Sequence, residues 1–132
     1  MNRPPTGRAD MEPLPSRDIL ARPVLSTLVW WLPQAAIAAA LLAPIPARAA
    51  IWIAALVWTG AACLLNAKRC GRTHCRYTGP FYLGMVVPVM AAAWVSAPMT
   101  AWIALAVAIL IGGKVIWWAT ERAWGKFGRV TN

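Results

Sequence analysis

The sequence predicts an all-α fold, an integral membrane bundle of four transmembrane helices, from its composition, its charge distribution and the length of its apolar segments. Of the 132 residues 60% are hydrophobic, whereas soluble domains are about 45–50% apolar. An excess of this size requires a surface that faces lipid. Charged residues lie almost entirely outside four long apolar stretches, at 24–43, 49–67, 80–97 and 100–119.

Each apolar stretch has the length of a membrane-spanning helix. Segments of roughly 18–20 residues, rising about 1.5 Å per residue, cover a hydrocarbon core near 30 Å thick. Each should be helical, because backbone groups inside a bilayer must be satisfied within the segment. Pro33 and Pro88 are therefore expected to kink their helices rather than end them.

The basic residues predict the orientation of the bundle. With four spans, the N-terminal tail, the loop 68–79 and the C-terminal tail share one side, and Arg48 alone lies on the other. By the positive-inside rule, both termini are placed in the cytoplasm and the protein in the cytoplasmic (inner) membrane. The cytoplasmic side carries eleven basic residues: Arg3, Arg8, Arg17, Arg22, Lys68, Arg69, Arg72, Arg76, Arg122, Lys126 and Arg129.

The predicted organisation is a leader, one membrane domain and a tail. The leader, 1–23, is rich in Pro and charge and is expected to be a largely disordered cytoplasmic segment. The transmembrane domain is 24–119, with the cytoplasmic loop 68–79, and 120–132 is a basic cytoplasmic tail. The first apolar stretch is interpreted as a retained helix, because it is longer than the apolar core of a secretory signal.

Charge and composition exclude several function classes. The formal net charge is +9, but the basic residues bracket apolar spans instead of forming a soluble face, so no nucleic-acid partner is expected. No predicted span contains Asp, Glu or His, which argues against a proton relay or haem ligation. Small multidrug transporters have a similar length and span count, but they require an acid in the first helix. The first span of this chain has none, so that family is excluded. The one intramembrane charge, Lys114, is expected to snorkel to the headgroups, with a functional role as the alternative.

The loop 68–79 contains the residues best suited to chemistry. It holds Cys70, His74 and Cys75. Cys63 lies near the end of the preceding span and would share a helix face with Cys70 if that helix continues past Asn66. Thiols on a reducing cytoplasmic face should be free, and a compact Cys and His set favours metal or redox chemistry. Thiolate and imidazole suit Cu(I), Zn(II) or another soft metal. We therefore predict a metal site formed by Cys70, His74 and Cys75, with Cys63 as a fourth ligand if it reaches.

Other interpretations of the same loop remain open. Its four basic residues would lower the pKa of the thiols and could equally contact anionic lipid headgroups or a partner protein. The spans would then belong to a non-catalytic accessory subunit of a larger membrane complex, or to a homo-oligomer. A third alternative is a membrane thiol oxidoreductase using Cys70 and Cys75, although no catalytic constellation beyond this pair predicts an enzyme. The basic residues are Lys68, Arg69, Arg72 and Arg76.

The segment 66–83 resembles a known pattern. Cys70-Gly71-Arg72-Thr73-His74-Cys75, followed by Thr78-Gly79-Pro80 and an aromatic residue, is similar to the signature of an uncharacterised family of small prokaryotic four-helix membrane proteins. The chain more loosely resembles the small mercury-resistance membrane proteins, which are short and Ala-rich. Those proteins carry a Cys pair in the first helix, where this chain has Val29-Trp30-Trp31-Leu32. Gly79-Pro80 is also expected to begin the third helix, with Thr78 or Gly79 as its cap.

Overall fold

The computed structural model describes residues 22–125, and this part of the chain is helical almost throughout. The predictions for 1–21 and 126–132, including the disorder of the leader, lie outside the described residues. The elements in order are α1 (Pro23–Ser26), the π-helical η3 (Thr27–Trp31), α2 (Leu32–Ala39), the 3₁₀ turn η4 (Ala40–Leu42), α3 (Ile45–Cys70), α4 (Thr73–Gly84), α5 (Val86–Trp94) and α6 (Met99–Trp124).

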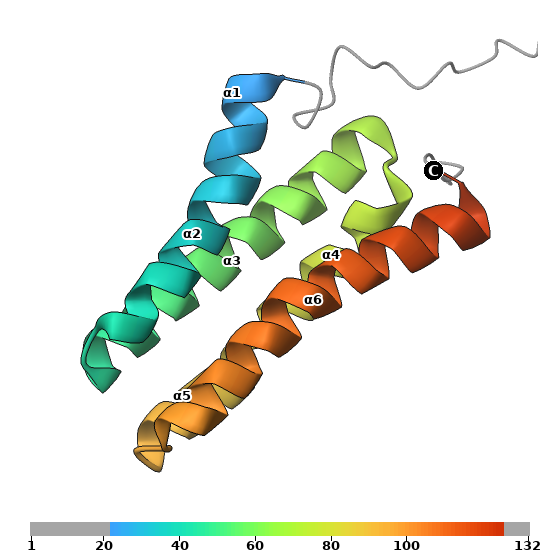
Figure 1. The fold of residues 1–132 in the computed structure, drawn as a ribbon. Helices are drawn as coiled ribbons and strands as arrows, with labels where there is room; N and C mark the ends of the chain where they lie inside the picture. The colour runs from blue at the N-terminus through green and yellow to red at the C-terminus, as the bar shows by residue number, and fades with distance from the viewer. Residues whose placement is uncertain (1–21, 126–132) are drawn as a thin grey trace, which may run out of the picture.

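The helices form two antiparallel hairpins that pack side by side. Figure 1 shows the segment from α1 to η4 running against α3, and α4 with α5 running along α6. The α2–α3 and α5–α6 turns lie at one end of the bundle. The α3–α4 turn and both ends of the described chain lie at the other end (Figure 1). We call the latter the loop end of the bundle.

Three helical stretches are long and apolar enough to cross a membrane: Pro23–Leu42, Ile45–Arg69 and Met99–Trp124. The predicted third span, 80–97, is instead shared between α4 and α5, which are separated at Met85. Pro88 accounts for the interruption, because it has no N–H for the Gly84 carbonyl and its ring crowds that carbonyl. Near Pro33 the chain adapts differently, by forming the π-helical turn η3 directly before it.

The outer surface of the bundle is apolar. Along α6, Ile103, Val107, Ile111 and Val115 follow one another at four-residue spacing and are all exposed. The opposite face of the same helix is buried and includes Trp102, Ala106 and Ile109. A helix that is apolar on both faces is typical of a membrane span. The described part of the chain therefore has the surface of an integral membrane protein.

A buried arginine closes the first hairpin. Arg48, in the first turn of α3, is 5% exposed. Its Nη2 donates hydrogen bonds to the carbonyls of Leu41 and Ala43, both at 2.8 Å, and its Nε donates to Ala40 at 3.3 Å. Its guanidinium also lies 5.1 Å from the centre of the Trp102 ring. The side chain thus adds hydrogen bonds to three carbonyls at the end of the first helical stretch, where the Ala40 carbonyl also accepts from the Ala43 N–H.

The predicted loop 68–79 is mostly helical. Helix α3 continues to Cys70 and ends at Gly71, whose φ of 68° places it in the left-handed conformation that favours glycine at a helix end. Helix α4 begins at Thr73, so the expected helix start at Gly79-Pro80 is wrong and Pro80 lies inside α4. Thr78 does not cap a helix, because its hydroxyl donates to the His74 carbonyl at 2.6 Å.

Glycines allow close packing between helices. A Cβ on Gly60 of α3 would lie 2.8 Å from Leu83 Cγ, and a Cβ on Gly79 of α4 would lie 2.8 Å from Leu64 Cγ. The two contacts are reciprocal, so α3 and α4 cross at Gly60 and Gly79, as small residues permit in membrane bundles. A Cβ on Gly113 of α6 would overlap the Tyr82 hydroxyl of α4. Backbone contact with α3 and aromatic contact with α6 thereby fix α4 in place.

Candidate functional site

Two cysteines from different helices meet near the loop end of the bundle. Cys63 on α3 and Cys75 on α4 are both free thiols and are only 4% and 1% exposed. The two thiols lie close enough to influence each other's ionisation. Asn66, one turn beyond Cys63 on α3, donates its side-chain N–H to Cys75 Sγ at 3.6 Å. We call Cys63 and Cys75 the thiol pair.

The surroundings of Cys75 favour its thiolate. The hydrogen bond from Cys63 lowers the pKa of the Cys75 thiol, and so do the neighbouring His74 ring and the Asn66 amide, while burial acts in the opposite direction. The hydrogen bonds prevail, so the pKa of Cys75 lies below the ordinary value for cysteine. Thiolate is the form of cysteine that binds metals and reacts as a nucleophile.

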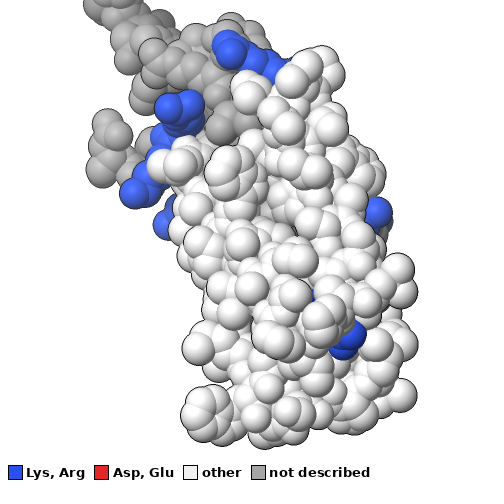
Figure 2. Space-filling view, turned by 90° about the vertical axis from the view of Figure 1, so that its left-hand side faces the viewer, with Lys and Arg blue, Asp and Glu red and all other residues white. Residues whose placement is uncertain are grey.

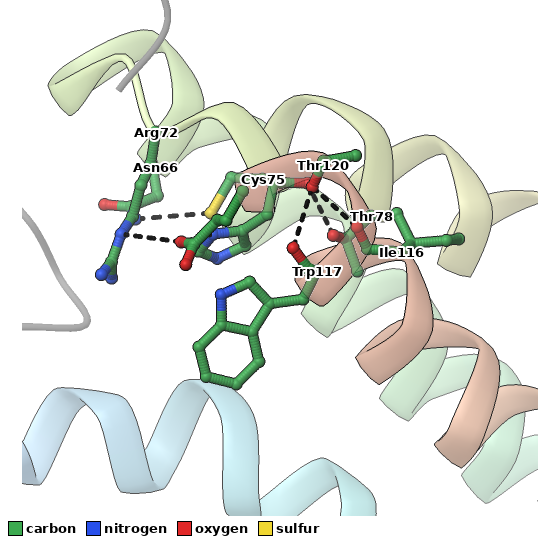
Figure 3. Close-up of polar contacts among 9 residues, drawn as sticks. Asn66, Arg72, Cys75, Thr78, Ile116, Trp117 and Thr120 are labelled. Atoms are coloured by element: carbon green, nitrogen blue, oxygen red, sulfur yellow. Dashed lines mark hydrogen bonds and ion pairs between the residues drawn. The ribbon is translucent and has the colours of Figure 1, made fainter. Parts of the chain in front are cut away.

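His74 is held between α4 and α6. Its Nδ1 lies 2.8 Å from Oε1 of Glu121, and its ring centre lies 5.4 Å from that of Trp117. Arg72 Nε lies 4.0 Å from the same carboxylate oxygen. Figure 3 shows Arg72 beside the Asn66–Cys75 hydrogen bond, with the Trp117 ring below them. Since Glu121 contacts Nδ1, the Nε2 atom of His74 is the ring nitrogen left for another partner.

A second polar group lies deeper in the bundle. The Tyr82 hydroxyl of α4 accepts a hydrogen bond of 3.2 Å from the Gln34 side chain of α2. The Tyr82 ring packs edge-to-face on Trp30, with ring centres 5.9 Å apart. Trp30 in turn lies 6.4 Å from Trp117. Trp117 of α6, Trp30 of η3 and Tyr82 of α4 therefore form a line of rings from the His74 region to the centre of the bundle.

The structure brings together some of the residues predicted for the site and separates others. His74 and Cys75 are buried side by side in α4, and Cys63 joins them from α3. The side chain of Cys70, the remaining predicted metal ligand, lies outside the described residues. Lys114 is exposed on α6 and does not join the cluster. Within the described side chains, no group of three or more His, Cys, Asp and Glu residues has the arrangement of a metal site.

The four predicted contact residues of the loop differ in their surroundings. Lys68, Arg69 and Arg76 are exposed, whereas Arg72 is partly buried and directed to Glu121. Figure 2 shows a mostly uncharged face, with most of its Lys and Arg atoms gathered toward the upper end and a few lower on the right-hand side. A charged end beside an apolar body is what a headgroup layer and a hydrocarbon core would each contact.

Sequence reasoning missed three contributors to the site. Asn66 is a polar residue at the end of an apolar span, three residues after Cys63, and that spacing places both on one helix face. Glu121 is the only acid outside the N-terminal tail. That isolation was the signal by which the sequence could have identified it. Tyr82 carried no signal, because an aromatic residue in an apolar span is ordinary.

Comparison of the chain with protein-family models, with curated proteins and with solved structures finds no match.

Proposed function

We propose that this protein binds a soft metal ion at the thiol pair, in the part of a membrane bundle closest to the cytoplasm. The observation that carries the proposal is the placement of two buried thiols from two helices, Cys63 and Cys75, at the same part of the α3–α4 contact, where Asn66 of α3 hydrogen-bonds Cys75 of α4. Two sulfur ligands on separate rigid elements are preorganised for an ion placed between them. Transport and sensing of the ion are both compatible with such a site.

The ligands favour Cu(I) among the soft metals. Thiolates select soft ions such as Cu(I), while a closed zinc site takes four protein ligands. Two thiols with a neighbouring imidazole offer fewer, unless Cys70 contributes. Glu121 supports the same assignment, because metal-binding histidines commonly donate their other ring N–H to a carboxylate. In this proposal His74 Nε2 faces the ion and Glu121 orients the ring.

We further propose that 80–97, which is shared between the end of α4 and α5, forms a fourth span and that both termini are cytoplasmic, in an inner membrane. The pair runs along the full α6 helix in Figure 1. Of the described basic residues, Arg48 alone lies at the end opposite the loop end, and its charge is engaged by carbonyls. The positive-inside rule then places the loop end in the cytoplasm. The exposed Lys68, Arg69 and Arg76 would contact anionic headgroups there.

Metal analysis of purified protein tests the proposed site. Full-length protein incubated with Cu(I) should retain about one equivalent, and the Cys63→Ser and Cys75→Ser variants should each lose most of it, because a two-thiol site cannot lose a thiol and remain intact. Cys70→Ser is the matched control. It should retain Cu(I) if the thiol pair is the site and lose Cu(I) if the site is centred on the loop. Retention of Cu(I) by both Cys63→Ser and Cys75→Ser, or no retention by the wild type, would refute the proposal.

A second candidate function uses the same contact between thiols. Cys63 and Cys75 are neighbouring thiols, so a two-electron acceptor in the membrane could take two electrons, with loss of two protons, and join them as a disulfide, as in a membrane thiol oxidoreductase. Freshly isolated membranes distinguish the two functions, because the metal-binding hypothesis predicts free thiols and the redox hypothesis predicts a Cys63–Cys75 disulfide in part of the protein. Silent cysteine substitutions, with loss of a co-purifying complex on Arg76→Gln, would instead favour the accessory subunit.

A further inference from the structure

A stripe of polar residues continues from the thiol pair into the bundle. Asn66, Cys63 and Thr59 recur along α3 at three- and four-residue spacing, and all three are buried. This spacing puts them on one face of the helix, so Thr59 lies one turn deeper than Cys63. Tyr82 follows Gly79 by three residues on α4, the helix that crosses α3 at Gly60, the neighbour of Thr59.

Two polar atoms in this region have no hydrogen-bond partner in the described part of the chain. They are the hydroxyl oxygen of Thr59, whose residue is 1% exposed, and the side-chain oxygen of Gln34. Gln34 directs its amide N–H to Tyr82, so its oxygen remains for another donor. Leaving a buried polar atom unpaired costs about 1–3 kcal/mol. Water bound among such groups, with two or more polar partners, removes that cost.

The polar region is closed on its far side. Toward the α2–α3 and α5–α6 turns, Ile37, Leu56, Val89 and Ile109 come from four helical segments and are at most 1% exposed. The polar side chains thus lie between the thiol pair on one side and a tightly packed apolar layer on the other. The thiol pair therefore separates the polar side chains from the loop end, and the apolar layer lies on their other side.

We infer that Gln34, Thr59 and Tyr82 enclose a water-holding chamber beside Cys63, which receives small hydrophilic cations from the thiol pair. The inference deepens the proposed metal function and rests on it, because it gives the bound ion a second polar location past the thiol pair. A site that only stores an ion has no need for such a location. The chamber therefore favours transport over storage, with the apolar layer as the barrier that must open.

Cysteine accessibility tests the chamber. The test uses full-length protein with Cys63, Cys70 and Cys75 replaced by Ser. In this background a Thr59→Cys thiol should react with the small cation methanethiosulfonate-ethylammonium about tenfold faster than a Leu56→Cys thiol. The reason is that thiolate is the form of cysteine that attacks such reagents, and thiolate forms in water. Leu56 belongs to the dry layer, and Val57→Cys, on the outer surface next to it, reports reaction from the detergent or lipid side. Reaction of Thr59→Cys as slow as that of both controls would refute the chamber.

A stability measurement keeps the inference testable if labelling perturbs the fold. In otherwise wild-type protein, Thr59→Val replaces the hydroxyl with a methyl group of similar shape. It should lower the Tm if the hydroxyl holds water, and raise the Tm if the hydroxyl is buried dry and unpaired. A raised Tm would overturn the inference. If the wild type retains Cu(I) but the Thr59→Cys thiol is unreactive, the chamber is refuted and the metal function stands. If the Thr59→Cys thiol is reactive but the wild type retains no Cu(I), the metal function is refuted and the chamber stands.

Discussion

The imidazole of His74 on α4 and the carboxylate of Glu121 on α6 face each other at 2.8 Å, although the two residues are 47 positions apart in the sequence. This contact joins the last turns of α6 to the start of α4, directly beside the thiol pair. His74 is almost fully buried, so the carboxylate replaces the water that would otherwise satisfy Nδ1. Glu121 therefore connects the end of the last helix to the candidate site.

Glu121→Gln should weaken metal binding without abolishing it. The amide keeps the size of the side chain but loses the charge that fixes the imidazole, and such outer partners of metal ligands typically contribute about 10–100-fold in affinity. Competition with a Cu(I) chelator measures the change. Arg122→Gln, one residue further along and exposed, is the matched control and should leave affinity unchanged. Equal affinities for all three proteins would show that Glu121 has no part in binding.

Gly113→Ala should destabilise the bundle by about 1–3 kcal/mol, because the added methyl group overlaps the Tyr82 hydroxyl and the core must be overpacked. Thermal unfolding in detergent measures the loss. Combining Gly113→Ala with Tyr82→Phe should recover part of it, since the overlapping oxygen is then absent. Gly84→Ala is the control, because a Cβ there meets no atom within 4 Å. A Gly113→Ala protein as stable as wild type would contradict the packing of α4 on α6.

Arg48→Gln should lower stability by about 1.5–3 kcal/mol, because hydrogen bonds from a buried charged group to three carbonyls at the end of the first helical stretch are lost. Chemical unfolding of the purified protein gives the difference. Lys114→Gln removes an equal charge from an exposed position and should change stability by less than about 0.5 kcal/mol. If the two substitutions cost the same, Arg48 acts only through its charge and not as a cap.

Cys63→Ala should raise the pKa of the Cys75 thiol. The Cys63 hydrogen bond is the largest of the effects that lower this pKa, so its loss should move thiolate formation to higher pH. The ultraviolet absorbance of thiolate, followed against pH in a Cys70→Ser background, reports the titration. Comparison with Asn66→Ala in the same background ranks the two hydrogen bonds, and the shift should be larger for Cys63→Ala. An unchanged titration would show that the two thiols do not hydrogen-bond.

The general fold could be predicted from the sequence because it depends on local properties. Apolar length and the need to satisfy backbone groups in lipid predict helices at 24–43, 49–67 and 100–119, and the structure has long apolar helices over each of these ranges. The interruption of the third stretch at Met85 was not predicted, because how a proline is accommodated depends on the neighbouring helices. The same holds for 73–79, where polar residues in a helix resemble a loop in sequence.

The candidate site was predicted only in part. Sequence proximity singled out Cys70, His74 and Cys75, and helical spacing related Cys63 to Cys70. The contact that forms in the structure is between Cys63 and Cys75, and it follows from how α3 crosses α4. That crossing depends on Gly60 and Gly79 fitting against Leu83 and Leu64. No one-dimensional pattern reveals such a fit, and none pairs His74 with Glu121.

The crossing of α3 and α4 at Gly60 and Gly79 also sets the spacing of the thiol pair. Gly60 lies one turn from Cys63, and Gly79 lies one turn from Cys75, so the distance between the helix axes at the crossing sets the span between the two sulfurs. Replacing either glycine with alanine would wedge the helices apart without touching a sulfur. If the thiol pair binds an ion as proposed, substitutions at these two positions should change which ionic radius the pair accepts, so two missing side chains would help to set the metal preference together with the thiols.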